Sequence, residues 1–256
     1  KELILAGNKM GRDKPLYGSS DMSGVITISD AIPTMGALEK LLVGANGFKG
    51  SESGKTLGDA IAINTALKEL DISGGDRDSK RCDVEFIKTF LVSLSANGAM
   101  TKLDASNNNM FGRSDKRAIQ AWADVLKTNS ILLELNLAEN DIRAKDVKIF
   151  ADGVSANGAL VKFDISKNIL YAEGTKFVAE ALKGNQIMTE LSISDNYMTY
   201  DGSNYGDMSG VIAISNTIPT MGALTSLDIS NNSLTKVKDS YDSSKGETPA
   251  SMYSME

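Results

Sequence analysis

Apolar residues recur along the chain in a fixed pattern that includes asparagine. In a complete copy the first, fourth and sixth positions are apolar, the ninth is asparagine and the eleventh is apolar, as from Leu132 to Ile142. The chain holds eight copies, and asparagine fills the ninth position in seven of them: Asn8, Asn46, Asn108, Asn140, Asn168, Asn196 and Asn232. Because alternating residues face one side of a β-strand, each copy predicts a short strand, followed by a turn whose backbone the asparagine amide can bond.

Helical spacing replaces this pattern between the copies. Apolar residues recur there three, four, seven and eight positions apart, which places them on one face of a helix. The stretches 118–126, 147–154 and 177–182 show this spacing most clearly. Successive asparagine positions, with Gly75 counted in the third copy, lie 38, 29, 33, 32, 28, 28 and 36 residues apart. The base period is therefore 28 residues, with insertions.

This repeat resembles the leucine-rich repeat family, in its ribonuclease-inhibitor-like class. The resemblance covers nearly the whole chain. It implies an α/β solenoid, a curved horseshoe with about eight parallel strands on the concave face and helices on the convex face. We expect residues 1–236 to form the solenoid and the polar residues 237–256 to form a loop or tail. Neither end shows the polar cap that a solenoid needs, which predicts that the chain is part of a longer array.

Two nearly identical segments lie far apart in the chain. Residues 21–38 and 207–224 match at 15 of 18 positions, 186 residues apart. Each segment follows an expanded turn that contains Tyr-Gly, at Tyr17 and at Tyr205. This match indicates a larger repeat unit superimposed on the short one.

Composition excludes several classes of function. The 256 residues include no histidine and one cysteine, Cys82, which rules out histidine-based catalysis, histidine metal sites and internal disulfides. The formal net charge of −6 argues against nucleic acid, and no apolar run is long enough for membrane insertion. We therefore expect no enzyme activity, no cofactor and no bound metal. The lone cysteine favours a reducing compartment, which predicts an intracellular location, cytoplasmic or organellar.

Two short motifs have a chemical and a structural interpretation. The segment from Gly50 to Thr56 is similar to a phosphate-binding loop, but three residues separate its glycines where that motif needs four. It also opens a repeat helix, so we expect its glycines to be structural. Cys82 follows Lys80 and Arg81, which could lower a thiol pKa. Without histidine or a second cysteine nearby, we expect an unreactive or buried thiol.

Two columns of side chains are predicted to point outward from the strands. The first alternates in sign at every repeat and predicts a self-neutralising ladder: Glu2, Lys40, Glu69, Lys102, Glu134, Lys162 and Glu190. The second is mostly acidic and consists of Asp71, Asp104, Asn136, Asp164, Ser192 and Asp228. Its carboxylates could bind Ca²⁺ or act as acid and base, could be an ordinary feature of the family's strands, or could attract basic partners. We favour the second of these interpretations.

A rigid curved surface without catalytic groups favours protein–protein interaction. We predict an interaction module or scaffold that binds a protein partner, within a larger assembly, through the concave strand face and the adjacent turns. The candidate contacts are the second outward column together with Glu139, Lys167 and Asp195. One alternative is a regulator of enzyme activity, such as a GTPase-activating leucine-rich-repeat protein. A hydrolase or nucleotide-binding enzyme is a third hypothesis, against which the absence of histidine and the broken phosphate loop count.

The third copy departs most from the repeat. Gly74 and Gly75 replace the usual polar residue and asparagine, and Arg77 stands where an apolar residue belongs. Asp76, Asp78 and Lys80 add charge to the same turn. With fewer ways to satisfy its backbone, residues 74–83 are predicted to form a protruding, mobile, charged loop that contacts a partner. Asp76, Arg77 and Asp78 are its candidate contacts, and a tolerated drift of one repeat is the alternative.

Overall fold

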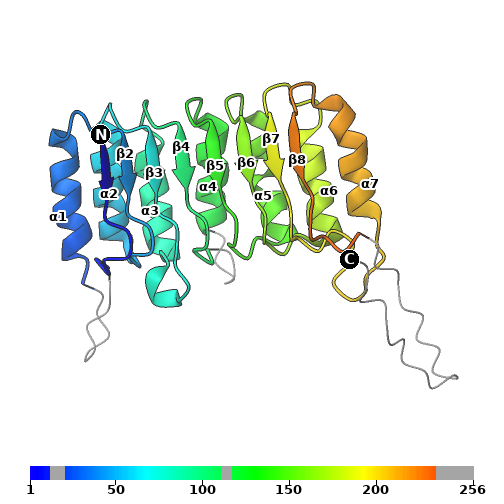
Figure 1. Cartoon of the computed structure of the whole chain (residues 1–256), viewed down its shortest axis with the longest axis horizontal. Helices are drawn as coiled ribbons and strands as arrows, with labels where there is room; N and C mark the ends of the chain where they lie inside the picture. Colours follow the sequence, from blue (N-terminus) through cyan, green and yellow to red (C-terminus); the bar gives the residue numbers. More distant parts are fainter. Residues whose placement is uncertain (12–20, 111–116, 235–256) are drawn as a thin grey trace, which may run out of the picture.

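Each copy of the repeat forms one three-residue strand. The computed structural model describes residues 1–11, 21–110 and 117–234 (Figure 1). Within these residues the strands are β1 (Glu2–Ile4), β2 (Lys40–Leu42), β3 (Glu69–Asp71), β4 (Lys102–Asp104), β5 (Glu134–Asn136), β6 (Lys162–Asp164), β7 (Glu190–Ser192) and β8 (Ser226–Asp228). They form one parallel sheet in chain order, as the repeat predicted. Residues 237–256, predicted to be a loop or tail, lie outside the described residues.

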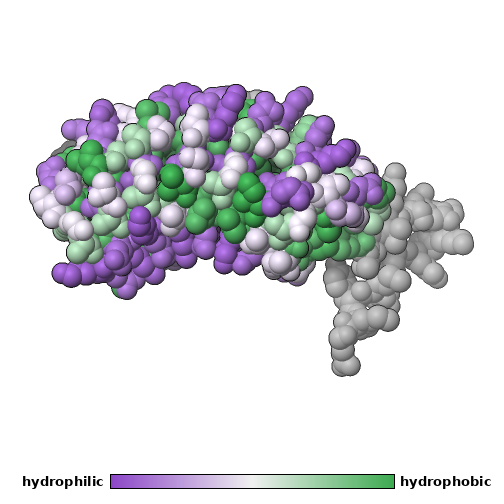
Figure 2. Space-filling view, turned by 90° about the horizontal axis from the view of Figure 1, so that it is seen from above, coloured by the Kyte–Doolittle hydropathy of each residue, from purple (hydrophilic) through white to green (hydrophobic). Residues whose placement is uncertain are grey.

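A helix follows nearly every strand and packs behind the sheet. The α-helices of the described residues are α1 (Ser23–Ala31), α2 (Ser51–Ile63), α3 (Val84–Leu94), α4 (Arg117–Thr128), α5 (Ala144–Ala156), α6 (Tyr171–Leu182) and α7 (Ser209–Thr217). Helices are about 10 Å wide and strands about 4.8 Å apart, so the stack bends with the strands inside. Figures 1 and 2 show a shallow arc of this kind. The predicted α/β leucine-rich-repeat solenoid is confirmed.

The core fills the space between the sheet and the helices. The middle residue of each inner strand points inward, and Leu70, Leu103 and Leu135 are at most 2% exposed. From the helical side, Trp122 of α4 and Phe150 of α5 are equally buried. Burying an aliphatic or aromatic side chain contributes about 1.5–3 kcal/mol, so the repeated pattern supplies the driving force of the stack.

The repeat asparagines form a ladder where the strands end. Asn140 Nδ2 donates to the carbonyls of Ala105, Leu137 and Ala138, each at 3.1 Å. Its Oδ1 accepts the N–H of Asn108 in the preceding repeat at 3.0 Å. The amides of Asn46, Asn108, Asn168, Asn196 and Asn232 donate in the same manner. An unmade buried hydrogen bond costs about 1–3 kcal/mol, which explains why asparagine recurs at this position.

A second asparagine ladder, which the sequence analysis missed, lies where the strands begin. Asn97 Nδ2 donates to Ile61 of the preceding repeat at 2.7 Å, and its Oδ1 accepts the N–H groups of Ala99 and Met100. The acceptor half of this turn recurs at Asn64, Asn129, Asn157 and Asn185. Its signal is an asparagine three residues ahead of the first apolar residue of a copy. The sheet is therefore anchored at both ends of its strands.

The prediction that Arg77 takes the apolar position of the third copy is wrong. Cys82 fills that position: it is 5% exposed and lies in the core, whereas the Arg77 side chain is 76% exposed. The Cys82 N–H donates to Asn108 Oδ1 at 2.7 Å, which is the bond that Ile142 makes to Asn168 in a regular repeat. An insertion has moved the anchor along the chain without removing it. The expected buried thiol is confirmed by this low exposure, and burial raises the pKa of the Cys82 thiol to about 12.

The segment that is similar to a phosphate loop is part of helix α2. Gly50 is its N-cap, and the Gly50 N–H already donates to the Asp83 carboxylate at 3.0 and 3.1 Å. A Cβ on Gly54 would come within 2.2 Å of the Phe86 carbonyl oxygen, and one on Gly58 within 2.6 Å of the Ser93 side chain. These glycines allow α2 to approach α3 closely, so their role is structural.

The two nearly identical segments have the same structure. In the first, α1 is followed by the 3-10 helix η1 (Ile32–Thr34), and in the second, α7 is followed by η3 (Ile218–Thr220). Each 3-10 helix has proline in its first turn. The shared sequence thus encodes a shorter helix that ends in a 3-10 turn before the next strand.

Candidate protein-interaction surface

Charged side chains alternate along the first outward column of the sheet. The register places Glu2, Lys40 and Glu69 side by side, and the alternation continues to Glu190. Lys40 Nζ lies 3.3 Å from Glu2 and 3.4 Å from Glu69, and the lysines of β4 and β6 bridge their neighbours at 2.9–3.8 Å. The hydrogen bond to Glu2 and the charge of Glu69 raise the pKa of Lys40. The predicted self-neutralising ladder, called the paired column below, is confirmed.

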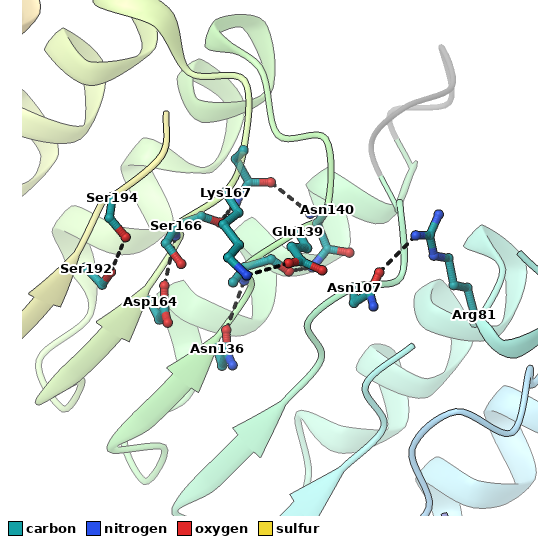
Figure 3. A network of polar contacts seen from close by, with 12 residues as sticks. Arg81, Asn107, Asn136, Glu139, Asn140, Asp164, Ser166, Lys167, Ser192 and Ser194 are labelled. Carbon is teal, nitrogen blue, oxygen red and sulfur yellow. Dashed lines mark hydrogen bonds and ion pairs between the residues drawn. The ribbon is translucent and has the colours of Figure 1, made fainter. Parts of the chain in front are cut away.

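The second outward column, called the acidic column below, is held by the backbone instead. It consists of Asp71, Asp104, Asn136, Asp164, Ser192 and Asp228, on adjacent strands. Asp164 Oδ1 accepts the N–H of Ser166 at 2.8 Å (Figure 3), and the other Asp and Asn residues bond in the same way at 2.7–2.9 Å. These local turns explain why Asp or Asn recurs at the strand end. In the described part of the chain, none of the four aspartates forms an ion pair.

A shallow groove lies over the strands from β4 to β8. It encloses about 350 Å³ and is lined by both columns, from Lys102 and Asp104 at one end to Asp228 at the other. Hydrophilic side chains line the inner margin of the arc (Figure 2). The negative charge of the groove that is not paired with a lysine lies in the acidic column.

The turn residues that follow the acidic column come together in part. Glu139 and Lys167, both predicted contacts, bond one another at 2.8 Å (Figure 3). The bond to Glu139 is the main cause that raises the pKa of Lys167, and the charges of Asp195 and Asp164 add to it. These residues therefore continue the polar surface from the strands onto the turn edge.

The predicted loop of the third copy extends beyond the edge at which the strands end (Figure 1). Its residues Asp76, Arg77 and Asp78 are exposed, and it contains the 3-10 helix η2 (Asp78–Lys80). Asp76 forms an ion pair with Lys80 at 2.8 Å, whereas Arg81 bonds Asp78 and also reaches Asn107 in the next repeat at 3.0 Å (Figure 3). Partner contact and mobility of this loop stay predictions.

The sequence analysis missed two apolar side chains on β1 and β2, where the outward column begins. Ile4 is 61% exposed and lies opposite Leu42, so β1 and β2 present an apolar pair where later strands present carboxylates. The signal was available, because both residues occupy the outward position of their copies. The inner face thus changes from apolar to acidic along the stack.

Among the residues that the structure describes, no group of three or more acidic or cysteine side chains is placed to hold a metal ion. No helix in those residues has the length and apolar character needed to cross a bilayer.

Comparison with known proteins supports the repeat. A family model described as Leucine Rich Repeat matches residues 223–242. No curated protein matches the chain. Among solved structures, the Leiomodin-1 Actin-Binding Site 2 is 18% identical with a TM-score of 0.45, covering 54% of this chain and 76% of its own. The tropomodulin C-terminal domain of Caenorhabditis elegans is 14% identical with a TM-score of 0.44, covering 70% of this chain and 82% of its own. An internalin from Listeria monocytogenes is 12% identical with a TM-score of 0.29, covering 90% and 87%.

The repeats and the parallel sheet form an α/β solenoid of the leucine-rich-repeat type, and the matched repeat model covers one copy of the repeat. Its assignment to the ribonuclease-inhibitor-like class stays a prediction.

Proposed function

We propose that this protein is an interaction module that binds a basic segment of a protein partner along its inner strand face. One observation carries the proposal. The paired column nearly cancels its own charge, with four glutamates against three lysines, and the acidic column beside it has no cationic partner within ion-pair distance in the described residues. The surplus negative potential of the face therefore comes from Asp71, Asp104, Asp164 and Asp228, and it favours a positively charged partner.

The spacing of the strands sets the geometry of recognition. Neighbouring strands lie about 4.8 Å apart, so Asp71 and Asp104, on adjacent strands, present carboxylates at that interval. Asp104 and Asp164 are two strands apart, with Asn136 between them. An extended segment has a rise of about 3.3 Å per residue, so basic side chains at alternate positions recur near 6.6 Å, between the one-strand and the two-strand interval, and the flexible lysine stem spans the difference. Such a segment lying across the strands can meet successive carboxylates.

The apolar end of the face gives the bound segment a direction. Ile4 and Leu42 offer an apolar contact, and the groove over β4–β8 offers the acidic one. A segment with one apolar end and one basic end therefore fits in one orientation. Each carboxylate accepts a hydrogen bond from an N–H of its own turn, which holds the oxygens in place and lowers the ordering cost of binding.

The turn edge extends this surface. Asp195 and the Glu139–Lys167 pair continue the acidic column, and the loop with Asp76, Arg77 and Asp78 projects from the same edge as the strand ends (Figure 1). We include these residues in the proposed contact area, with the strand face as its centre.

Titration with a defined peptide tests the proposal. The probe is an extended peptide that alternates lysine and glycine and ends in two leucines, with its glutamate counterpart as control. In the full chain, combining Asp104→Asn, Asp164→Asn and Asp228→Asn should weaken lysine-peptide binding about three- to hundredfold, since each exposed charge pair contributes about 0.2–1 kcal/mol. Asparagine keeps the acceptor for the local turn, so the fold should be retained.

A matched control separates local recognition from net charge. Combining Asp30→Asn, Asp124→Asn and Asp152→Asn removes the same number of charges from exposed positions on the helices α1, α4 and α5. This variant should bind the lysine peptide nearly as well as the original chain. Equal weakening in both triple variants would show that only the overall charge matters and would reject the strand face as the site.

A further inference from the structure

Four tyrosine rings gather at the edge where the strands end, near the last repeats. The Tyr171 ring centroid lies 4.9 Å from that of Tyr200 and 6.2 Å from that of Tyr197. Tyr200 and Tyr205 lie 5.0 Å apart. Tyr197 is 40% exposed, and the other three rings are half-buried. These four residues, called the tyrosine cluster, are absent from the surface predicted from the sequence.

The turn that carries the tyrosine cluster is internally bonded. Tyr200 and Tyr205 form an antiparallel bridge, and Asp201 Oδ1 accepts the N–H groups of Ser203 and Asn204, each at 2.7 Å. The N–H of Asp207 donates to the Thr199 carbonyl at 3.0 Å. The rings are therefore presented on a preorganised turn, which reduces the entropy cost of binding.

Two of the rings sit on backbone positions that disfavour aromatic residues. Tyr197, directly after the ladder asparagine, has φ 57°, in the left-handed region. The same position in other repeats is occupied by Lys9, Gly47, Asn109, Asp141 and Ser233. Tyr171 also has a left-handed φ of 58°. Glycine, asparagine and aspartate tolerate this conformation far better than a bulky side chain, so tyrosine occupies these positions at a local cost.

The asparagine ladder is irregular beneath the tyrosine cluster. In regular repeats the Oδ1 of each ladder asparagine accepts an N–H from the repeat before it, as Asn168 does from Asn140. Among the described residues no donor reaches Asn196 Oδ1, and the Tyr171 N–H bonds the Asn196 main-chain carbonyl instead. In the conformation that brings Tyr171 against Tyr200, the hydrogen bond to Asn196 Oδ1 is therefore missing from the ladder.

Three carboxylates lie within two residues of these rings in the sequence. Asp195 precedes Tyr197 by two residues, Asp201 follows Tyr200 directly, and Asp207 follows Tyr205 by two. The Ser209 hydroxyl and N–H hold the pKa of Asp207 below its usual range. The charge of Lys176 acts on Asp207, and Lys167, which pairs with Glu139, acts on Asp195. The local balance is negative, which disfavours phosphate-bearing partners.

We propose that the tyrosine cluster is a second contact surface, which receives arginine side chains from an extended basic segment of a protein partner. Arginine stacks on aromatic faces and pairs with carboxylates at the same time, and this site offers both groups together. It lies on the turn edge, apart from the strand face, and it does not require that the strand face bind.

Calorimetric titration of the full chain tests this surface. The probe is a short peptide alternating arginine and glycine, compared with the same peptide in which citrulline, a neutral isostere, replaces arginine. Tyr197→Asn places at this position the residue found at Asn109, so the fold should be kept, and its thermal melt is the control. We expect this variant to weaken arginine-peptide binding about two- to fivefold, and combination with Tyr205→Leu to weaken it further. The citrulline peptide should not bind detectably.

Specific outcomes would overturn the proposal. If Tyr197→Asn folds normally and binds the arginine peptide as tightly as the original chain, or if citrulline binds equally, the tyrosine cluster is not an arginine site. The ratio of the dissociation constants for the arginine peptide, with and without Tyr197→Asn, is then measured in the variant that combines Asp104→Asn, Asp164→Asn and Asp228→Asn. A ratio that persists there supports an independent surface. A ratio that vanishes assigns all arginine binding to the strand face and rejects this inference, while the proposed function stands.

Discussion

The two outward columns of the sheet share the same strands and differ in what holds their charges. In the paired column each lysine contacts glutamates on both sides, so the partner of every inner charge is another side chain of the ladder. In the acidic column each carboxylate bonds the backbone two residues further along its own strand. The paired column is held by ion pairs across repeats. The acidic column is held mainly by local turns within each repeat, with one bond across repeats from Asn136 Nδ2 to Asp104 Oδ2 at 3.1 Å.

This difference shows how one sheet can combine stacking with recognition. Paired charges on neighbouring strands favour the stack by about 0.2–1 kcal/mol per pair and leave little free potential. Carboxylates fixed by neutral N–H groups keep their full charge and stay available to a partner. The difference is testable, because the columns should respond oppositely to substitution, salt and pH.

The largest effect should come from the side chain between the columns. Leu135 lies between Glu134 and Asn136, and it is 2% exposed. Leu135→Ala should lower the free energy of unfolding by about 2–5 kcal/mol, because it leaves a cavity in the core. Denaturant melts measure this value and set the scale for both columns. A smaller loss than from any outward substitution would contradict the strand orientation.

Reversing one charge of the paired column should destabilise the stack next most. Lys102 lies 3.3 Å from Glu69 and 3.8 Å from Glu134. Lys102→Glu replaces two attractions by two repulsions and should cost about 1–2 kcal/mol at low salt. Added salt should recover part of the loss, because it screens exposed charges. Lys102→Gln is the matched control, and a loss that salt does not change would point to a cause other than charge.

The acidic column should tolerate loss of charge better than loss of its acceptor. Asp104→Asn keeps an acceptor for the Ser106 N–H and should change the free energy of unfolding by only a few tenths of a kcal/mol. Asp104→Ala removes the acceptor and should cost about 0.5–1 kcal/mol. Chemical melts of the two variants give the comparison. Equal losses in both would mean that the charge, and not the turn, stabilises this column.

The smallest effects should appear at opposite ends of the pH scale. The hydrogen bond from Lys162 to Glu190 raises the pKa of Lys162, so its contribution is complete below its ordinary value of 10.5 and is lost as pH rises through the folded value. The Ser230 N–H lowers the pKa of Asp228, so its contribution is complete above 3.8 and is lost as pH falls through the folded value.

Difference melts against Lys162→Gln and Asp228→Asn measure these contributions across pH. The first difference should shrink in alkali and the second in acid. The reverse assignment would contradict the partners seen here.

Much of the fold followed from spacing alone. Leu135, Leu137 and Asn140 fix strand, face and turn within one copy, and their repetition fixes the parallel register that brings Lys102 between Glu69 and Glu134. These features were predictable because each depends on residues a constant distance apart.

Features that depend on variable spacing were missed. A fixed count along the third copy ends at Arg77, but the insertion moves the apolar anchor to Cys82. The tyrosine cluster joins Tyr171 to Tyr200, and only the conformation of the expanded turn brings these rings together. The positions of the acidic column could be predicted from the repeat. The local hydrogen bonds of its carboxylates, and the lack of ion pairs to them, could be seen only in the structure.

The two asparagine ladders act as a length gauge for the chain. They are eleven residues apart in four successive repeats, from Asn97 to Asn108, Asn129 to Asn140, Asn157 to Asn168 and Asn185 to Asn196. Repeat lengths vary from 28 to 38 residues, so the variation falls outside this interval. Natural variants of such an array can therefore gain or lose residues on the helical side and in the turns without changing the strand register. A recognition loop can therefore be grafted at those places. A loop inserted between the two asparagines of a repeat would change their eleven-residue spacing and disturb the strand register.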